Sequence, residues 1–380
     1  MADVFDGIWG QPKVREFFRG CVAQGRVGQS YLFCGPAGSG KLQAALALAA
    51  AVLCQEDGCA SCKVCKKVLR QKHPDVRVFW PEGASGYLIE QLRGILNDVS
   101  LAPIQAKSKV YILNRVDLLG ASCANAFLKT LEEPPEGVTI ILSARTRDSV
   151  LPTILSRCQV VPFRHIPESE AVGLVCQNAQ VTKERARAAL AACDGSIERA
   201  SHFATSNEMM AFRRRILDSL AKLMDADDWD ILGFSEALIL DAKAPLDGIK
   251  ADQELQLEEA KDFLASSARK QIEARNKRIL SAKSSEMMHV ITAVCHSWLR
   301  DVVALCAECP QLVVNQDAME SLQRAADHTN EARAARACGL VKDCEEALAY
   351  NVSPQTSLDV LLLDVREVLY DPDCTGKPCL

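Results

Sequence analysis

The sequence has few aromatic residues, no excess of positive charge and no long apolar run. Aromatic residues make up 5% of the 380 residues and hydrophobic residues 48%, a balance rich in alanine and leucine that favours helices over a β-sandwich. The net charge of −5 gives no overall basic footprint, so a contact with nucleic acid has to be local or shared with partner chains. The longest apolar run, residues 44–54, is too short to span a bilayer, and the first residues carry no signal segment. We expect a soluble, cytoplasmic protein of the α/β or mostly helical class with no membrane partner.

A glycine-rich loop near the start of the chain carries all but one of the residues of a phosphate-binding motif. The loop consists of Gly35, Pro36, Ala37, Gly38, Ser39, Gly40, Lys41 and Leu42. In the pattern G-x-x-x-x-G-K-[ST], backbone N–H groups and the lysine hold phosphates, and the final hydroxyl holds Mg²⁺. Apolar residues 31–34 before the loop and alanine-rich residues 41–53 after it supply the strand and the helix that the motif requires. Because Leu42 has no oxygen, we predict that the loop is either a scaffold or a passive pocket for ATP or ADP, without hydrolysis.

The second part of a hydrolysing nucleotide site is also missing. Such a site needs an apolar strand that ends in Asp, which helps to hold Mg²⁺, and commonly a following Glu that activates water. The strand predicted over residues 110–113 ends in Asn114 and Arg115. Asp117 comes three residues later than the register requires, and a misplacement of an ångström or more is costly in catalysis. We therefore predict no intrinsic ATPase activity; a hydrolysing enzyme that uses Asp117 is the alternative.

Seventeen cysteines are scattered through the chain, and four of them lie within twelve residues. These four, spaced as C-x4-C-x2-C-x2-C, are Cys54, Cys59, Cys62 and Cys65. In a chain with no export signal, the others are expected to be small buried hydrophobic residues with no special role. At this cysteine content, C-x2-C-x2-C arises by accident roughly 0.03 times per chain. Four thiolates at this spacing can surround one tetrahedral ion, so we predict a closed, structural Zn²⁺ site on an exposed polar knuckle.

The apolar pattern alternates between strands and helices in the first part of the chain. Strands are predicted over residues 31–34, 75–80, 110–113, 138–142 and 160–163, and helices over 41–53, 88–98, 121–131 and 149–156. This alternation implies a parallel sheet covered on both faces. Beyond it we predict a small helical bundle over 168–205, broken at Gly195, and helices throughout from about residue 207. The charged stretch 251–286 is interpreted as a solvated helical face or hairpin, and residues 371–380 are expected to fray.

A series of motifs, in a particular order and spacing, indicates the family that this chain resembles. They are Gly10-Gln11, the glycine loop, the cysteine cluster after its helix, His73-Pro74-Asp75, the sequence LKTLEEPP at 128–135 and Ser156-Arg157-Cys158. With these motifs the chain resembles the delta-prime subunits of bacterial DNA polymerase III clamp loaders, which are AAA+ proteins related to the gamma/tau motor subunits. The resemblance is strong over residues 1–165, moderate to 205, and rests mainly on helical character beyond.

The resemblance implies three domains and a place in a larger assembly. The domains are an AAA+ nucleotide-binding fold at 1–165 with a zinc module at 54–65, a helical lid at 166–206 and an all-α collar at 207–380 that joins five subunits into an open ring. In the family, this ring of gamma/tau, delta and delta-prime subunits uses ATP to open the sliding clamp and place it on primed DNA. The Arg of Ser-Arg-Cys reaches the ATP of a neighbouring motor subunit. The resemblance therefore implies that Arg157 is an arginine finger acting in trans.

Departures from the motor subunits favour the stator-like delta-prime type. The motor subunits carry a Thr or Ser at the sensor position after the fourth strand, where this chain has Ser143-Ala144. They also carry an Arg near the Gly-Ser of the lid, where this chain has Glu198. A hydrolysis-competent gamma-type subunit or a free-standing AAA+ ATPase remains the first alternative. A zinc-dependent nucleic-acid-binding module is another, although the acidic balance gives it little support. From the residues alone, Arg157 can also be read as an arginine that interacts with the dipole at the end of the helix over 149–156.

Overall fold

The computed structural model describes residues 3–83, 86–259, 266–350 and 352–371. The chain divides into two compact units, one made of residues 1–174 and 195–197 and the other of residues 175–194 and 198–380. The predicted division into three domains at residues 165 and 206 stays a prediction.

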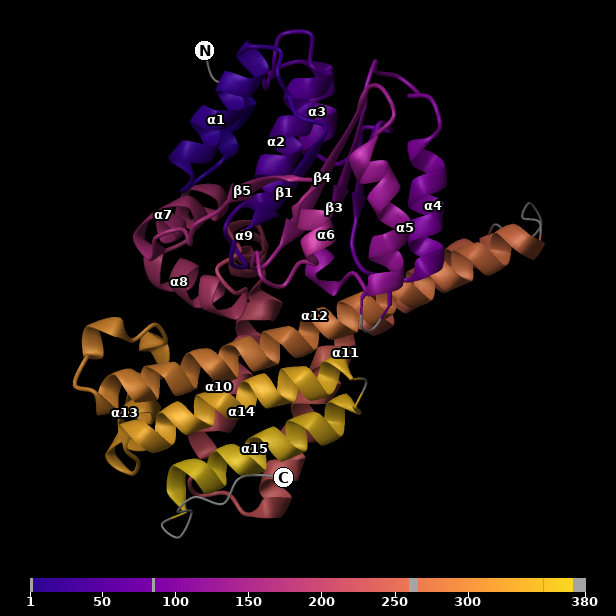
Figure 1. Ribbon diagram of the computed structural model, residues 1–380. Helices are drawn as coiled ribbons and strands as arrows, with labels where there is room; N and C mark the ends of the chain where they lie inside the picture. Colours follow the sequence, from indigo (N-terminus) through magenta and orange to yellow (C-terminus); the bar gives the residue numbers. More distant parts are fainter. Residues whose placement is uncertain (1–2, 84–85, 260–265, 351, 372–380) are drawn as a thin grey trace. The chain divides into compact units, whose positions relative to one another are not determined.

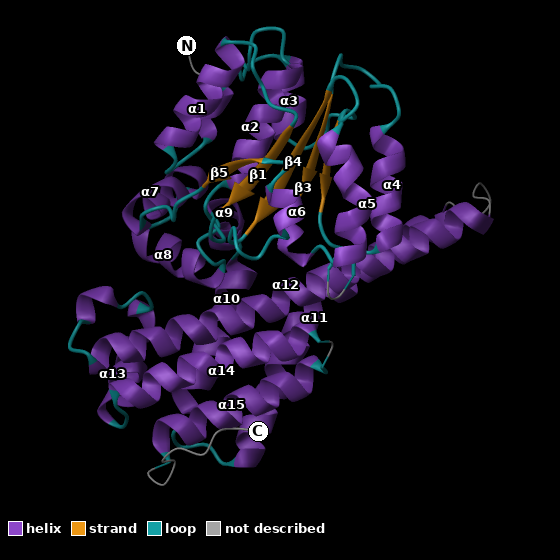
Figure 2. Cartoon of the chain, in the orientation of Figure 1, coloured by secondary structure: helices purple, strands orange, loops and turns teal. Residues whose placement is uncertain are grey.

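A five-stranded parallel sheet forms the centre of the first unit (Figure 2). In spatial order its strands are β2 (Val76–Phe79), β3 (Lys109–Leu113), β4 (Val138–Ala144), β1 (Ser30–Cys34) and β5 (Gln159–Pro162). Every pairing is parallel, with Ser30 opposite Ile140 and Val76 opposite Val110. All residues of β1, β3 and β4 are buried, as expected of strands in a sheet that is covered on both faces. The predicted α/β fold with a parallel sheet is confirmed.

Helices cover both faces of this sheet (Figure 1). They are α1 (Pro12–Ala23), α2 (Lys41–Leu53), α3 (Lys63–Leu69), α4 (Ile89–Val99), α5 (Ala121–Glu132) and α6 (Pro152–Leu155), with the short 3₁₀ helices η1 (Val4–Gly7) and η2 (Val116–Leu118). Helix α7 (Glu168–Ala179) follows β5 and contains residues of both units. Successive side chains of a strand point to opposite faces. Accordingly, Tyr31 and Phe33 of β1 pack in one core with α1, α2 and α3, whereas Leu32 packs in a second core with α4, α5 and α6.

Three predicted helices are confirmed, and one is shorter than predicted. The helices over 41–53, 88–98 and 121–131 are α2, α4 and α5. The helix predicted over 149–156 was too long, because α6 starts only at Pro152. Leu151 has ψ 134°, and the proline that follows disfavours helical geometry at this residue. Helices α1 and α3 are not among the predicted elements.

The second unit is helical in the residues that the structure describes. Its helices are α8 (Lys183–Ala192), α9 (Ile197–Thr205), α10 (Asn207–Lys222), α11 (Asp228–Glu259), α12 (Ser266–Cys306), α13 (Met319–Asp327), α14 (Glu331–Ala349) and α15 (Pro354–Tyr370), with 3₁₀ helices η3 (Pro310–Leu312) and η4 (Gln316–Ala318). Gly195 has φ +71° and separates α8 from α9, as predicted. Helix α12 packs against α8, α10, α11, α13 and α14, and its Trp298 is fully buried. The helical character predicted for this region is confirmed.

The charged stretch 251–286 spans the end of α11 and the first part of α12, and residues 260–265 within it lie outside the described residues. Arg269 and Glu273 form an exposed ion pair on α12, in keeping with a solvated helical face. Residues 372–380, which include most of the tail expected to fray, also lie outside the described residues. Among the helices described, none is both long enough and apolar enough to cross a membrane.

Candidate functional site

The phosphate loop connects β1 to α2, and its shape depends on glycine. Gly38 and Gly40 have φ +71° and φ +81°, in the left-handed region that other residues rarely adopt. A Cβ atom on Gly35 would lie 2.4 Å from the carbonyl oxygen of Phe163, at the end of β5. Since α2 starts at Lys41, the first N–H groups of the helix face the end of the loop, where a helix favours an anion.

Lys41 folds back over the loop that precedes it. Its Nζ donates hydrogen bonds to the carbonyl oxygens of Gly35 and Pro36, both at 2.6 Å, and to Ser39 Oγ at 3.2 Å. Burial lowers the pKa of the Lys41 ammonium to about 8, and the negative charge of Asp117 opposes this shift. A phosphate bound beside the ammonium would favour its charged form. An ammonium has three N–H donors, so Lys41 would have to exchange at least one of these hydrogen bonds to contact a phosphate oxygen.

The two positions that would hold Mg²⁺ carry side chains engaged elsewhere. Leu42 packs against the apolar core of α1, α2 and α3. Asn114, directly after β3, is buried, and its Nδ2 donates to the carbonyl oxygen of Phe79 at 3.3 Å. Its Oδ1 accepts a hydrogen bond from Ser143 Oγ at 3.0 Å. The amide of Asn114 thus connects the ends of β2, β3 and β4, and it brings no negative charge to the site.

Arg115 and Asp117 neutralise each other after β3. Arg115 has φ +57°, and its Nε lies 2.9 Å and 3.2 Å from the two carboxylate oxygens of Asp117. The Asp117 side chain is only 7% exposed. The alternative in which Asp117 holds Mg²⁺ would therefore have to break a half-buried ion pair, and that makes the alternative less favourable.

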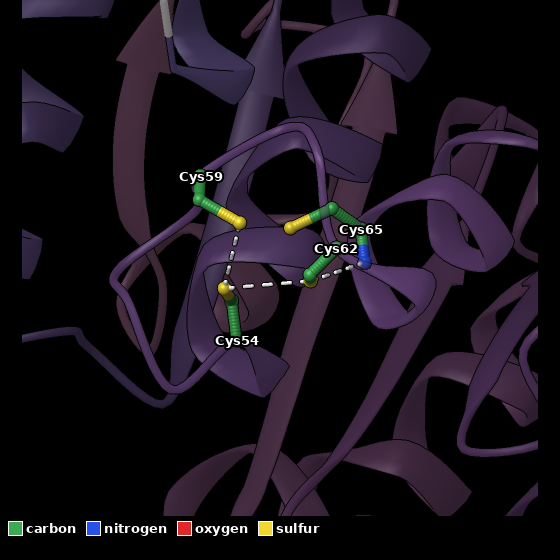
Figure 3. Close-up of side chains that lie close together, drawn as sticks. All are labelled: Cys54, Cys59, Cys62 and Cys65. Atoms are coloured by element: carbon green, nitrogen blue, oxygen red, sulfur yellow. Dashed lines mark hydrogen bonds between the residues drawn. The ribbon is translucent and has the colours of Figure 1, made fainter. Parts of the chain in front are cut away.

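The four clustered cysteines converge at the other end of α2 (Figure 3). Cys54 follows the last residue of α2, and Cys62 caps the start of α3. All four Sγ atoms lie within 4.8 Å of one another, and Cys54 Sγ lies 3.8 Å from the Sγ atoms of both Cys59 and Cys62. Four thiolates bound at about 2.3 Å around a tetrahedral Zn²⁺ lie roughly 3.8 Å apart. The cluster therefore has the donor atoms and the dimensions to bind a metal ion.

Backbone N–H groups support the sulfur atoms of this cluster. The amide of Glu56 donates to Cys54 Sγ at 3.4 Å, and the amide of Cys65 donates to Cys62 Sγ at 3.3 Å. Burial raises the pKa of the Cys54 thiol, but the hydrogen bonds of the surrounding amides outweigh it and bring the pKa to about 7. Thiolate is the form that binds metal. The loop thus favours the metal-binding form of Cys54.

The cluster is less exposed than the predicted knuckle. Cys54 and Cys65 are buried in the core of the first unit, whereas Cys59 and Cys62 are partly exposed. The amide of Val4 in η1 donates to the carbonyl oxygen of Gly58 at 2.9 Å, which ties the loop to the start of the chain. The polar residues between the cysteines suggested exposure, but the two outer cysteines lie on helix ends that pack into the core.

Arg157 lies just after α6, and its hydrogen bonds go to the end of α5 and to α6. Its Nε donates to Glu132 Oε1 at 2.6 Å, Nη2 donates to the same oxygen, and Nη1 donates to the carbonyl oxygen of Thr153 at 2.9 Å. The side chain is 28% exposed. The structure therefore brings the loop residues together in one place and the four cysteines together in another. Arg157 belongs to neither group and is hydrogen-bonded to residues of α5 and α6.

Two of the sequence motifs have structural roles that the sequence did not reveal. Gln11 Nε2 donates to the carbonyl oxygens of Ser39 and Arg164, and Gln11 Oε1 accepts from the amide of Arg164, so this one side chain connects the phosphate loop to the segment after β5. The carboxylate of Asp75 accepts hydrogen bonds from the amides of residues 104–106 at 2.6–2.8 Å and thereby shapes the loop before β3. Their presence in motifs was the only available signal.

Comparison with known proteins relates this geometry to a family. Residues 10–167 match the family described as DNA polymerase III, delta subunit. The chain is 36% identical over 157 residues to DNA polymerase III subunit delta' of Bacillus subtilis and 35% identical over 173 residues to subunit tau of the same organism. The N-terminal region is related to the delta' and gamma/tau clamp-loader subunits. The resemblance expected from the motifs is thus confirmed.

These matches cover 40% and 44% of this chain, and 47% and 30% of the Bacillus delta' and tau subunits, so the chain spans less than half of the length of each relative. Among solved structures, a DNA polymerase III gamma subunit-related protein of Thermotoga maritima is similar over 92% of this chain and 98% of that chain. Its sequence identity is 16% and the TM-score is 0.46.

Proposed function

We propose that this chain is a delta-prime-type subunit of the DNA polymerase III clamp loader, a stator that assists hydrolysis on a neighbouring subunit. One observation carries the proposal: the chain keeps the phosphate loop while Asn114 and the Arg115–Asp117 pair replace the carboxylates of a hydrolysing site. Its N-terminal relationship to the delta' and gamma/tau subunits supports the same role. The proposed partners are gamma/tau and delta subunits, with the sliding clamp and primed DNA reached through the cytoplasmic complex.

In this proposal the loop from Gly35 to Lys41 binds the phosphates of ATP or ADP passively. Backbone N–H groups at the start of α2 and the Lys41 ammonium supply the positive charge. The guanidinium of Arg157 stabilises the charge that develops on the γ-phosphate held by the neighbouring subunit, and such fingers contribute about 10³–10⁵ in rate. Cys54, Cys59, Cys62 and Cys65 hold a structural Zn²⁺ that ties the end of α2 to α3.

The experiment that tests the proposal reconstitutes the complex from this chain with motor and clamp-opening subunits. DNA-stimulated ATP turnover is measured with the unchanged chain, with Arg157→Ala and with Arg93→Ala, which removes an exposed arginine on α4. We expect Arg157→Ala to lower turnover at least tenfold in a fully assembled complex and Arg93→Ala to leave it unchanged. Unchanged turnover with Arg157→Ala in an intact assembly would reject the proposal that Arg157 is an arginine finger.

The second candidate function is a hydrolysis-competent gamma-type subunit. The observation in its favour is that tau of Bacillus subtilis and gamma of Buchnera aphidicola match this chain at 35% and 34% identity, close to the 36% of the delta' subunit. This candidate requires steady ATP turnover by the purified chain alone, abolished by Lys41→Ala. We expect no such turnover, since Leu42 and Asn114 offer no Mg²⁺ ligand of the usual kind.

A further inference from the structure

A carboxylate at the end of α5 holds the guanidinium of Arg157. We infer that Glu132 is a positioning residue, which sets the direction in which Arg157 meets the phosphate of a neighbouring subunit. The inference rests on the proposed function and adds to it a residue outside the Ser156-Arg157-Cys158 motif. Glu132 belongs to the LKTLEEPP motif, 25 positions earlier in the chain, so the contact joins two motifs that the sequence presents separately.

The hydrogen bonds of Arg157 leave little freedom to its head group. A guanidinium has five N–H donors. Nε and Nη2 each direct one donor to Glu132 Oε1, and Nη1 directs its two donors to the carbonyl oxygen of Thr153 at 2.9 Å and to Ser156 Oγ at 3.2 Å. One N–H donor on Nη2 therefore remains for a phosphate oxygen. The hydrogen bond to the Ser156 hydroxyl is the longest of the four, at 3.2 Å, so it is the one that a phosphate oxygen would replace first. The carboxylate and the carbonyl thus define which edge of the guanidinium points outward.

Glu132 is poorly explained as a residue that stabilises the helix. It is the last residue of α5, and a negative charge there interacts unfavourably with the negative end of the helix dipole. The ion pair is also too exposed to contribute much to folding, with side-chain exposures of 28% for Arg157 and 48% for Glu132. Removal of the Glu132 charge should therefore leave the fold intact and change mainly the orientation of Arg157.

The chain supplies its own matched control in Glu133. This residue is the next in the sequence, is exposed, and forms no side-chain hydrogen bond or ion pair with any residue that the structure describes. Glu133→Gln therefore makes the same chemical change as Glu132→Gln one position away. Glu132→Asp keeps the charge but shortens the side chain by one methylene, so it separates the effect of charge from that of position.

The test uses the reconstituted complex with motor and clamp-opening subunits and measures kcat and KM of DNA-stimulated ATP hydrolysis, with assembly checked by analytical ultracentrifugation. We expect Glu132→Gln to lower kcat about tenfold, within the hundredfold that an ångström of misplacement can cost, with KM unchanged. Glu132→Asp should fall between, and Glu133→Gln should match the unchanged chain. The double variant Glu132→Gln/Arg157→Ala should be no slower than Arg157→Ala alone, because the two residues act as one unit.

Three results would overturn the inference while leaving the proposed function standing. One is an unchanged kcat for Glu132→Gln beside a clear loss for Arg157→Ala. Another is a double variant whose loss is the product of the two single losses, which would mean independent roles. A third is a higher kcat for Glu132→Gln, which would make Glu132 a cap that the phosphate has to displace. Unchanged turnover for Arg157→Ala itself would instead reject the proposed function, and the inference with it.

Discussion

The two ends of α2 carry two sites of opposite character. At its start, the phosphate loop has its glycines and its lysine, but Leu42 and Asn114 replace the groups that would hold Mg²⁺. At its end, the cysteine cluster has all four sulfur atoms within 4.8 Å of one another. A structural metal site needs its whole ligand set, whereas a phosphate cradle made of backbone and one lysine can persist without the metal. The comparison sets a complete set of four possible metal ligands beside a phosphate loop that lacks the usual Mg²⁺ ligands.

The largest expected effect comes from removing one sulfur atom of the cysteine cluster at the end of α2. Cys62→Ser should abolish stoichiometric zinc binding and lower the free energy of unfolding by about 3 kcal/mol or more, because metal binding contributes roughly 10–16 kcal/mol in small zinc domains. Metal analysis of the purified chain and thermal unfolding measure the two effects. Cys176→Ser, outside the cluster, is the control. Full retention of one zinc per chain by Cys62→Ser would contradict the site.

At the loop end, Lys41→Ala should weaken ADP binding about 10- to 100-fold, the loss expected for hydrogen bonds to a charged group. Binding to the unchanged chain should be the same with Mg²⁺ and with excess EDTA, since the loop offers the metal no hydroxyl. Isothermal titration calorimetry measures both. A large loss of ADP affinity in EDTA would show that a metal ion takes part in nucleotide binding at the loop. The contrast between the two ends of α2 would then be smaller.

Gly35→Ala tests whether the loop is a packed part of the scaffold. The added Cβ would lie 2.4 Å from the carbonyl oxygen of Phe163, so we expect a loss of about 1–3 kcal/mol from overpacking. Gly94→Ala on α4 meets nothing within 4 Å and should stabilise the protein by up to about 1 kcal/mol. Urea unfolding of both variants provides the comparison, and equal stabilities would argue that the loop is loosely packed.

The smallest expected effect is a change of stability with pH, which should have opposite signs for the cysteine cluster and for an ion-pair network in the second unit. Hydrogen bonds to Asp194 and Glu345 raise the pKa of His289 to about 9. A raised pKa stabilises the fold fully below the unfolded value near 6.5, and this stabilisation is lost as the pH rises through about 9. Thiolate ligands behave in the opposite way and release metal as the pH falls.

The matched measurement is the stability of His289→Gln relative to the unchanged chain between pH 6 and pH 10. At the acidic end the variant should be less stable than the unchanged chain by about 1–2 kcal/mol, which is less than the full pKa shift implies because the side chains are partly exposed. At the alkaline end this difference in stability should vanish. A deficit that grows with pH would contradict the assignment of charge to this histidine.

Particular residues explain which parts of the molecule were predictable. The strands could be predicted because the apolar runs that precede Gly35 and Asn114 are continuous, and the helix over 121–131 because Ala124, Phe127 and Leu131 repeat at helical spacing and are in fact buried. The start of α6 was missed because Pro152 restricts the residue before it. The short helix α3 was missed because its seven residues are organised by the cysteines at its start more than by any apolar period.

The sequence alone determined which groups each site contains: the glycines and lysine of the loop, the four cysteines, the missing Mg²⁺ ligands and the motifs shared with clamp-loader subunits. Only the tertiary structure decided how those groups are used. It turned Asn114 inward to connect three strand ends, paired Arg115 with Asp117, buried two of the four cysteines and joined Glu132 to Arg157. The reason is physical, since composition and spacing specify chemistry along the chain, whereas hydrogen bonds between residues distant in sequence depend on the packing of the whole unit.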